Sequence, residues 1–351
     1  MHRPTLDEVA ALAGVGRGTV SRVINGSPQV SPQARAAVHK AIEELGYVPN
    51  RAARALVTRR TDAVALVVSE SEERVFGEPF FAGIVRGVSS HLADTRMQLW
   101  LAMAQSTAER QIVQRHLPDQ HVDGVLLLSL HDDDPLPGLL AGRGLPTVLG
   151  GRTTHMIEAG TNPATAKPEG RPDGHRVAFV DNDNEGGART AVEHLFSLGR
   201  RRVAAIAGPQ DMGVGKARLR GYRAALRLAS QPYDDRLVAY GDFSEASGAD
   251  AMYRLLRLDP GLDAVFAASD LMAAGAIRAL REQGRRIPAD VAVVGFEDSA
   301  VARQTLPPLT TVHQPVEGMG REMARLLLAR IAGAPADSTV LDTHLVVRES
   351  A

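Results

Sequence analysis

The sequence has no cysteine among its 351 residues, so disulfide bonds, thiolate zinc sites and a cysteine nucleophile are all excluded. No run of about 18 apolar residues is present, which argues against a membrane-spanning helix. The first residues, MHRPTLDE, lack the features of a signal peptide. We therefore expect a soluble protein that acts in the cytoplasm.

Motifs for catalysis are also missing. The eleven histidines are scattered, and no H-E-x-x-H, nucleotide P-loop or G-x-S-x-G sequence occurs. Asp132, Asp133 and Asp134 are consecutive and cannot all face one ion, so a solvated turn before Pro135 is the better interpretation. The sequence predicts no catalytic residue, no metal site and no cofactor.

Charge is distributed unevenly along the chain. Residues 1–60 hold nine Arg and Lys residues against four acids, a net charge of +5, whereas the remainder carries −6. The length suits a small module joined to a larger body. A basic head on an acidic body is typical of a phosphate-contacting module attached to a domain that does not bind DNA.

The stretch TLDEVAALAGVGRGTVSRVIN, residues 5–25, predicts two short helices. Thr5 and Glu8 form a capping box that begins the first helix, and Gly14 ends it. In the second helix Val20, Val23 and Ile24 would face inward. The opposite face carries hydrogen-bonding side chains, which are Arg17, Thr19, Ser21, Arg22 and Asn25. This combination favours a helix-turn-helix that reads the major groove over a plain helical hairpin.

A third helix and a short segment follow this motif. Ser31 and Pro32 begin a helix that runs to Leu45 and ends at Gly46. The segment NRAARAL, from Asn50, is helical in pattern but too short to be stable alone. From its pattern alone it could be a plain linker.

Apolar strands alternate with amphipathic helices from Asp62 onward. Strands are predicted at 63–68, 98–103, 122–128, 146–149, 177–180, 203–206, 236–240, 264–267, 291–294, 309–312 and 339–347. Helices are predicted at 80–92, 107–116, 136–142, 186–198, 218–228, 244–256, 273–283 and 316–331. The alternation predicts an α/β fold of two parallel, doubly wound sheets, with a ligand cleft at the carboxyl ends of their strands.

Two runs of residues carry a family resemblance. D-E-V-A-x-x-A-G-V followed by T-V-S-R-V-I-N resembles the signature of the lactose-repressor (LacI/GalR) family of bacterial transcription regulators. The resemblance extends over nearly the whole chain and implies a helix-turn-helix domain plus a two-lobed, periplasmic-binding-protein-like domain. In this family Asp183, Asn184 and Gly187 fit a D-N-x-x-G element, so Asp181, Asp183 and Glu185 are not read as a metal site.

The resemblance also implies which residues contact DNA. In the head these are Thr5, Arg17, Gly18, Thr19, Ser21, Arg22, Asn25 and Ser31. N-R-x-A-x-x-L matches the family's hinge helix, which folds on the operator beside its copy from a second subunit, with Asn50, Ala53 and Leu56 as contacts. Leu56 matches the leucine that wedges between base pairs in the minor groove.

Matches to the family predict the effector site between the lobes. The matching residues are Ser69, Glu70, Phe81, Arg218, Phe243, Asp270, Glu297 and Gln314. Arg218 could instead be a surface arginine, and Asp270 could cap the following helix. Glu297 departs from the family's usual aspartate, which puts its hydrogen-bond geometry in doubt. An aromatic face beside Arg, Asp, Glu and Gln fits a neutral sugar, through stacking and bidentate hydroxyl contacts.

Several alternatives for the ligand and the function remain open. The stretch S-E-S-E-E-R-V-F-G-E-P-F-F-A-G-I resembles cellobiose-responsive repressors of GC-rich bacteria, which favours cellobiose or another disaccharide. A purine or an amino acid could use a similar set of side chains. Outside regulation, the alternatives are a sugar-binding protein with no DNA role and a sugar-processing enzyme. The basic head and the missing catalytic motifs argue against these two.

The expected organisation has three parts. Residues 1–49 form the DNA-binding domain, 50–60 the hinge and 61–351 the effector-binding and dimerisation domain. Lobe 1 is expected at about 61–200 and 314–332, and lobe 2 at about 201–313 and 333–351. Residues 152–175 form an insertion without periodicity. No leucine heptad tail is seen, so we expect a homodimer on a palindromic operator.

Overall fold

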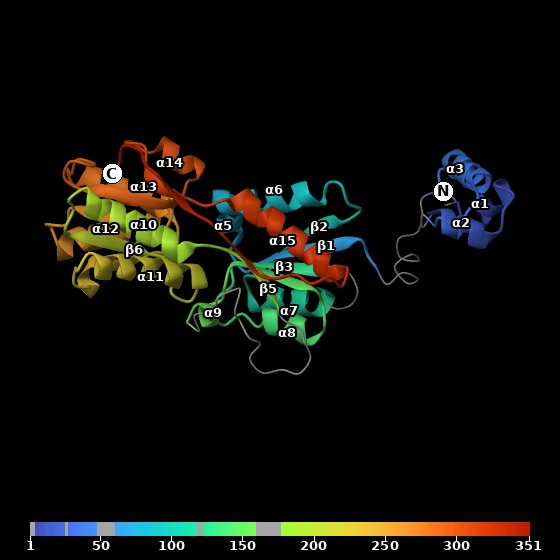
Figure 1. Cartoon of the computed structure of the whole chain (residues 1–351), viewed down its shortest axis with the longest axis horizontal. Helices are drawn as coiled ribbons and strands as arrows, with labels where there is room; N and C mark the ends of the chain where they lie inside the picture. The colour runs from blue at the N-terminus through green and yellow to red at the C-terminus, as the bar shows by residue number, and fades with distance from the viewer. Residues whose placement is uncertain (1–3, 25–26, 48–59, 118–121, 159–176) are drawn as a thin grey trace. The chain divides into compact units, whose positions relative to one another are not determined.

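The computed structural model describes residues 4–24, 27–47, 60–117, 122–158 and 177–351 of the chain. The chain divides into two compact units, Met1–Thr61 and Asp62–Ala351, which are described separately (Figure 1). None of the helices among the described residues is long and apolar enough to cross a membrane.

The first unit consists of three helices, which are α1 (Leu6–Leu12), α2 (Arg17–Ile24) and α3 (Pro32–Leu45). The predicted capping box is present. Thr5 Oγ1 accepts a hydrogen bond from the Glu8 backbone N–H at 3.3 Å, and the Glu8 carboxylate accepts one from the Thr5 N–H at 2.7 Å. Gly14 leaves α1 with a φ of +65°, in the left-handed region that favours glycine.

The third helix has the predicted start and end. Ser31 Oγ accepts a hydrogen bond from the Ala34 N–H at 3.3 Å, and Gly46 terminates α3 in the left-handed conformation. Val20 and Val38 are fully buried where the three helices meet. Ile24 packs against this core but is only partly buried.

The second unit contains two six-stranded sheets, with strand orders β11-β5-β4-β3-β1-β2 and β12-β10-β9-β8-β6-β7. The strands are β1 (Ala63–Val68), β2 (Gln98–Met103), β3 (Gly124–Leu128), β4 (Thr147–Gly150), β5 (Ala178–Asn182), β6 (Val203–Ala207), β7 (Val238–Tyr240), β8 (Ala264–Ala267), β9 (Ala292–Glu297), β10 (Thr310–His313), β11 (Thr339–Leu341) and β12 (His344–Val346). All of these neighbours pair in parallel except β10 with β12. The predicted fold class is confirmed.

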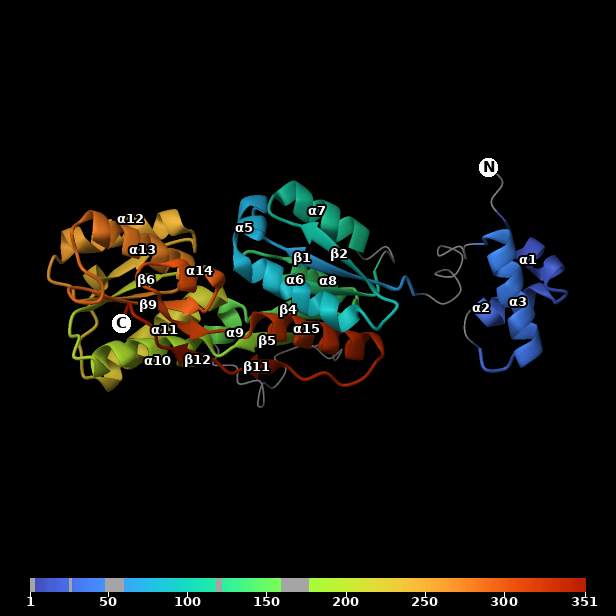
Figure 2. The same ribbon diagram turned by 90° about the horizontal axis from the view of Figure 1, so that it is seen from above.

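Helices cover both faces of each sheet. On the first sheet, α6 (Pro79–Leu92) and α15 (Val316–Ile331) lie on one face, and α7 (Thr107–His116) and α8 (Leu136–Gly142) on the other (Figure 1). On the second, α10 (Asn184–Ser197) and α11 (Gly213–Leu228) oppose α12 (Glu245–Leu258) and α13 (Asp270–Glu282) (Figure 2). Short elements complete the unit, namely α5 (Glu72–Gly77), α9 (Thr154–Glu158), α14 (Ala300–Gln304) and the 3-10 helix η2 (Asp235–Leu237).

The strand β1 shows why these sheets are buried on both sides. Val64 and Leu66 point into the core under α6 and α15, whereas Ala65 and Val67 point into the core under α7 and α8. Successive side chains of a strand alternate between faces, so a sheet with helices on both faces needs an unbroken apolar run. The sequence AVALVV supplies it.

The lobe boundaries differ from the prediction at two places. The chain passes to the second lobe at residue 183, since α10 packs on α11 and on the second sheet. The single strand predicted at 339–347 is two strands, β11 in the first sheet and β12 in the second. Apolar patterning marks a strand but does not identify the sheet it joins. Residues 159–175 of the predicted insertion lie outside the described residues, and residues 154–158 form α9.

Candidate functional site

The outward side of α2 presents the residues predicted to read DNA. Arg17, Gly18 and Arg22 are exposed, while Thr19 and Ser21 are half-buried. The Nε of Arg17 lies 3.7 Å from a carboxylate oxygen of Asp7, but the two side chains remain 72% and 70% exposed. An exposed ion pair of this kind is weak, so Arg17 stays accessible to a partner.

The other predicted DNA contacts divide into two groups. The hydroxyls of Thr5 and Ser31 cap α1 and α3, and both residues are exposed at those helix starts. Helix starts carry free N–H groups and a partial positive charge, which suits a phosphate. The remaining predicted contacts, Asn25, Asn50, Ala53 and Leu56, lie outside the described residues.

A pocket of about 710 Å³, part of it open to solvent, lies between the two sheets of the second unit. Its polar walls are formed where strands end, at Arg152 after β4, at Asp181 and Asn184 around the end of β5, and at Glu297 and Gln314 at or after β9 and β10. This is where ligands bind in open α/β sheets. Its remaining polar and aromatic walls are Arg74, Glu78, Phe80, Phe81, Asn182, Arg218 and Phe243.

Arg218 of α11 is the centre of the polar wall. Its side chain is buried, and its three nitrogens donate to Asn184 Oδ1 at 2.9 Å, to the Ala268 carbonyl at 2.5 Å and to Gln314 Oε1 at 2.8 Å. A Glu297 carboxylate oxygen lies 3.7 Å away. Arg218 therefore fixes the pocket residues Asn184 and Gln314, which the sequence separates widely. The alternative of a surface arginine is wrong.

A second pair stands beside it, formed by Arg152 and Asp181. The Nε of Arg152 donates to Asp181 Oδ2 at 2.7 Å, and Asn184 donates to Asp181 Oδ1 at 2.9 Å. Burial raises the pKa of Asp181, and the Arg152 guanidinium opposes that rise. This pair joins the ends of β4 and β5 to the network around Arg218.

The aromatic part of the pocket comes from both lobes. Phe243 follows β7 in the second lobe, and Arg74 of α5 in the first lobe lies over its ring at 5.6 Å from the centroid. Arg74 also donates to Glu78 at 2.7 Å. Phe80 and Phe81 meet edge to face, with ring centroids 5.4 Å apart.

Backbone strain accompanies this pocket. Ser129, Phe243 and Glu297 line it with φ values of +59°, +74° and +114°, which are unusual for residues other than glycine. Such conformations cost about 1–3 kcal/mol each and gather at ligand sites. Burial also raises the pKa of Glu297 above its usual range, although Arg218 opposes this. Strain and desolvation thus coincide at residues that face the pocket.

Three residues predicted for the cleft do not line this pocket. Ser69 and Glu70 are buried behind it, and Ser69 donates to Asp134 at 2.5 Å. Asp270 is fully buried, accepting hydrogen bonds from Thr311 at 2.5 Å and from the Ser299 N–H at 2.7 Å. Asp270 is not the cap of α13 either.

The cap of α13 is Ser269, one residue earlier. The predicted residues that do meet in the pocket are Phe81, Arg218, Phe243, Glu297 and Gln314.

Several pocket residues were not predicted from the sequence. Asp181 and Asn184 stand around the carboxyl end of β5, and Arg152 stands two residues after β4. Applying the strand-end rule to every strand of the first sheet would have selected them. Arg74 lies within α5 and Glu78 directly follows it, and this short helix has no sequence periodicity that would predict its position.

Among the described residues, no group of three or more His, Asp or Glu side chains could hold a metal ion. The pocket contains charged, amide and aromatic groups suited to binding by hydrogen bonds and stacking. The fold and the pocket define a two-lobed ligand-binding unit, preceded in the chain by a helix-turn-helix unit.

Family comparisons agree with this description. Residues 5–50 match the model for bacterial regulatory proteins of the lacI family, and residues 192–351 match a periplasmic binding protein-like domain. The HTH-type transcriptional regulator CelR of Thermobifida fusca is 58% identical over 99% of this chain and 98% of its own. The chain belongs to the lacI family of bacterial regulatory proteins. It is a DNA-binding transcription regulator, not an enzyme.

Other relatives and solved structures extend the comparison. The HTH-type transcriptional repressor PurR of Proteus mirabilis is 34% identical over 99% of this chain and 96% of its own. A transcriptional regulator CelR–cellobiose complex matches with 56% identity and a TM-score of 0.75, covering 99% of this chain and 100% of that one. The Lac repressor dimer bound to operator matches with 27% identity and a TM-score of 0.83, covering 99% of each chain.

Proposed function

We propose that this protein is a repressor whose operator binding is modulated by a neutral disaccharide, with cellobiose as the leading ligand. The observation that carries the proposal is the charge pairing in the pocket. Each of its three arginines has a carboxylate beside it: Arg74 with Glu78 at 2.7 Å, Arg152 with Asp181 at 2.7 Å and Arg218 with Glu297 at 3.7 Å. This pairing offsets much of the arginine charge, which disfavours an ionic ligand, and the same groups offer donors and acceptors to hydroxyl groups.

The aromatic wall supports a sugar more than a purely polar ligand. Phe243 offers a flat apolar face, and Phe80 and Phe81 add apolar surface from the first lobe. Sugar rings have apolar faces formed by their C–H groups, and these pack against aromatic rings. The space in the pocket is of the size used for small-molecule ligands. A CelR relative is known in complex with cellobiose, which supports the same ligand here.

A purine-type ligand is the second candidate, because repressors named PurR share about a third of the residues. A planar purine could also stack on Phe243. Their identity of 34%, against 58% for CelR, favours the sugar.

On the DNA side, we propose that α2 reads the major groove of each half of a palindromic operator and that the protein acts as a homodimer in the cytoplasm. The Lac repressor relative is a dimer bound to operator. The edge strand β2 exposes Trp100 and Leu101, apolar surface that a second copy could cover. Closure of the pocket around a bound sugar would shift the hinge segments of the two subunits, and this shift would weaken operator binding.

A ligand panel followed by operator binding tests the proposal. Thermal shift with cellobiose, glucose, a phosphorylated disaccharide and a purine base should give stabilisation by cellobiose, with little from the phosphorylated sugar. A fluorescently labelled operator should then be released by the stabilising sugar. Stabilisation by the purine base alone would favour a purine over a sugar as the ligand of this pocket.

A further inference from the structure

A histidine outside the pocket spans the two lobes. His131 follows β3 in the first lobe, and Asp211 precedes α11 in the second. The Nδ1 of His131 lies 2.7 Å from Asp211 Oδ2, and its Nε2 lies 3.4 Å from Glu70 Oε1. A neutral imidazole has only one N–H, so it can donate to only one of these carboxylates. Only the protonated ring suits both contacts.

The backbone brings the lobes together at the same place. The Asp132 N–H donates to the Asp211 carbonyl at 2.9 Å, and His131 forms an isolated β-bridge with Met212. At Gly213, a Cβ atom would lie 2.0 Å from the Arg152 carbonyl, so no larger residue fits this approach. The contact between His131 and Asp211 is therefore part of a close seam between the lobes.

Glu70 connects this seam with the ligand pocket. Its side chain is buried, and its Oε1 lies 2.6 Å from an Arg74 nitrogen. Among the described residues, no donor is aligned on that oxygen for a good hydrogen bond, so its contacts with Arg74 and His131 are chiefly ionic. A buried carboxylate without aligned donors depends on nearby cations for its stability. Arg74 and a protonated His131 are these cations, and Arg74 also lies over the pocket ring of Phe243.

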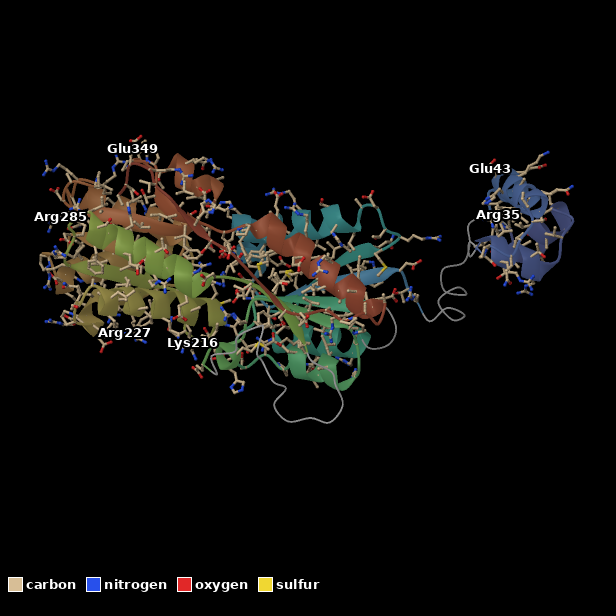
Figure 3. The ribbon with its side chains drawn as sticks, viewed as in Figure 1. Arg35, Glu43, Lys216, Arg227, Arg285 and Glu349 are labelled. Carbon is tan, nitrogen blue, oxygen red and sulfur yellow. The ribbon has the colours of Figure 1, made fainter. Side chains whose placement is uncertain are left out.

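The electrostatic setting agrees with the geometry. The contact with Glu70 and then that with Asp211 raise the pKa of His131 to about 9, while burial opposes the rise. Charged groups on the surrounding elements are Glu70 and Arg74 around the start of α5, Asp211 and Lys216 around the start of α11, and Asp132, Asp133 and Asp134 in its own loop. Lys216, which is labelled in Figure 3, pairs with Glu158 of α9, and Asp134 accepts a hydrogen bond from Ser69.

We propose that Glu70 is a positioning residue that joins the pocket residue Arg74 to an inter-lobe clasp made by His131 and Asp211, so that sugar binding is coupled to proton uptake at His131. The inference rests on the proposed sugar function and adds its regulation. When the lobes separate, His131 keeps Glu70, which is in its own lobe, but loses Asp211. The closed, sugar-bound form therefore holds the proton more tightly than the open form.

The sign of the pH dependence follows from this difference. A group whose pKa is higher in the closed form contributes affinity that is complete at low pH and is lost as pH rises through the closed-form value. Sugar affinity should fall between about pH 7 and the value of about 9 for His131. Uptake of one proton can change the sugar affinity by at most about tenfold per pH unit. Asp211 is 57% exposed and screened by water, so we expect a total loss of roughly three- to tenfold.

Calorimetry on the full-length protein with cellobiose measures both quantities. Titrations from pH 7 to 9.5 should show the fall in affinity. At pH 8.5, buffers of different ionisation enthalpy should reveal net uptake of a fraction of one proton per sugar. His131→Asn and Asp211→Asn should both flatten the pH profile. Asp211→Asn changes an exposed side chain, so this variant should fold normally and still remove the contact with His131.

Two more variants distinguish a positioning role of Glu70 from a general structural role. Glu70→Gln should move the fall in affinity to lower pH, because His131 loses a partner that raises its pKa in both the open and the closed form. It should also weaken sugar binding at pH 7, because Arg74 loses a partner. His313→Asn is the matched control, since His313 pairs with Asp298 at 3.0 Å entirely within the second lobe. Its pH profile should keep the wild-type slope.

Each result supports or contradicts the coupling. A flat wild-type profile, or a His131→Asn profile with the wild-type slope, overturns it while leaving the proposed function in place. Wild-type protein that binds no sugar at any pH contradicts the proposed function itself, and the coupling with it.

Discussion

Arg218 shows how one residue organises a ligand site from distant parts of the chain. Its guanidinium contacts Asn184, Gln314 and Glu297, which belong to three different strand ends, and it lies 3.8 Å from the ring centroid of Phe296. Burial lowers the pKa of Arg218, but a guanidinium remains charged at any pH at which proteins are studied. Removing the charge would leave buried partners unpaired.

Arg218→Met keeps side-chain bulk and removes the charge. We expect sugar affinity to fall at least a hundredfold, roughly the 3 kcal/mol typical of breaking a buried pair. Operator binding by the folded variant should remain near wild type. Calorimetry and operator titration measure the two effects. Arg227→Met is the control, because Arg227 lies exposed on the same helix (Figure 3). Loss of operator binding in Arg218→Met would assign this residue to overall folding instead.

Arg22 of α2 is exposed, and its position in the helix-turn-helix motif predicts that it reads a base. Arg22→Ala should cost about 1–3 kcal/mol of operator affinity and relax specificity at one position of each half-site. Titrations against single-base operator variants measure this change. Equal weakening on every operator variant would show that Arg22 contacts phosphate only.

Among the elements, the crossing of α6 and α15 depends on close backbone approach. A Cβ atom on Gly87 of α6 would lie 2.2 Å from the Glu317 carbonyl of α15. The two helices run side by side over the first sheet in both views (Figures 1 and 2). The crossing therefore allows only glycine at this position.

Gly87→Ala should destabilise the second unit by about 1–3 kcal/mol, because the helices must separate to admit the methyl group. Gly138→Ala on α8 is the matched control. Nothing lies within 4 Å of its added Cβ, so alanine there should stabilise the helix by up to about 1 kcal/mol. Urea unfolding compares the two variants. Equal stability for both would show that α6 and α15 can move apart freely.

At the scale of the whole molecule, the distribution of charge distinguishes operator binding from ligand binding. The net charge of +5 in residues 1–60 contrasts with the paired arginines of the ligand pocket. Operator affinity should therefore fall steeply with salt, with about 0.9 counterions released per phosphate contact. Cellobiose affinity should change little, since the ligand is neutral. Fluorescence anisotropy and calorimetry over about 50–300 mM salt test both statements. A salt-independent operator affinity would contradict the DNA-binding assignment.

The sequence by itself determined the local features of the head and the class of the fold. The caps at Thr5 and Ser31 and the stops at Gly14 and Gly46 each depend on a few neighbouring residues, and the structure confirms all four. The alternation of apolar strands with amphipathic helices determined two parallel sheets for the same reason, since periodicity is a local property.

Tertiary structure alone decided which side chains reach the ligand pocket. Phe243 and Glu297 face it through positive φ values that no sequence pattern predicts, and Glu70 stands behind it, although its sequence neighbours match the family. Arg152 meets Asp181 across 29 positions of the sequence because β4 and β5 are neighbours in the sheet. Strand order and the contacts between strand ends depend on distant segments of the chain, whereas propensity and periodicity act over only a few neighbouring residues.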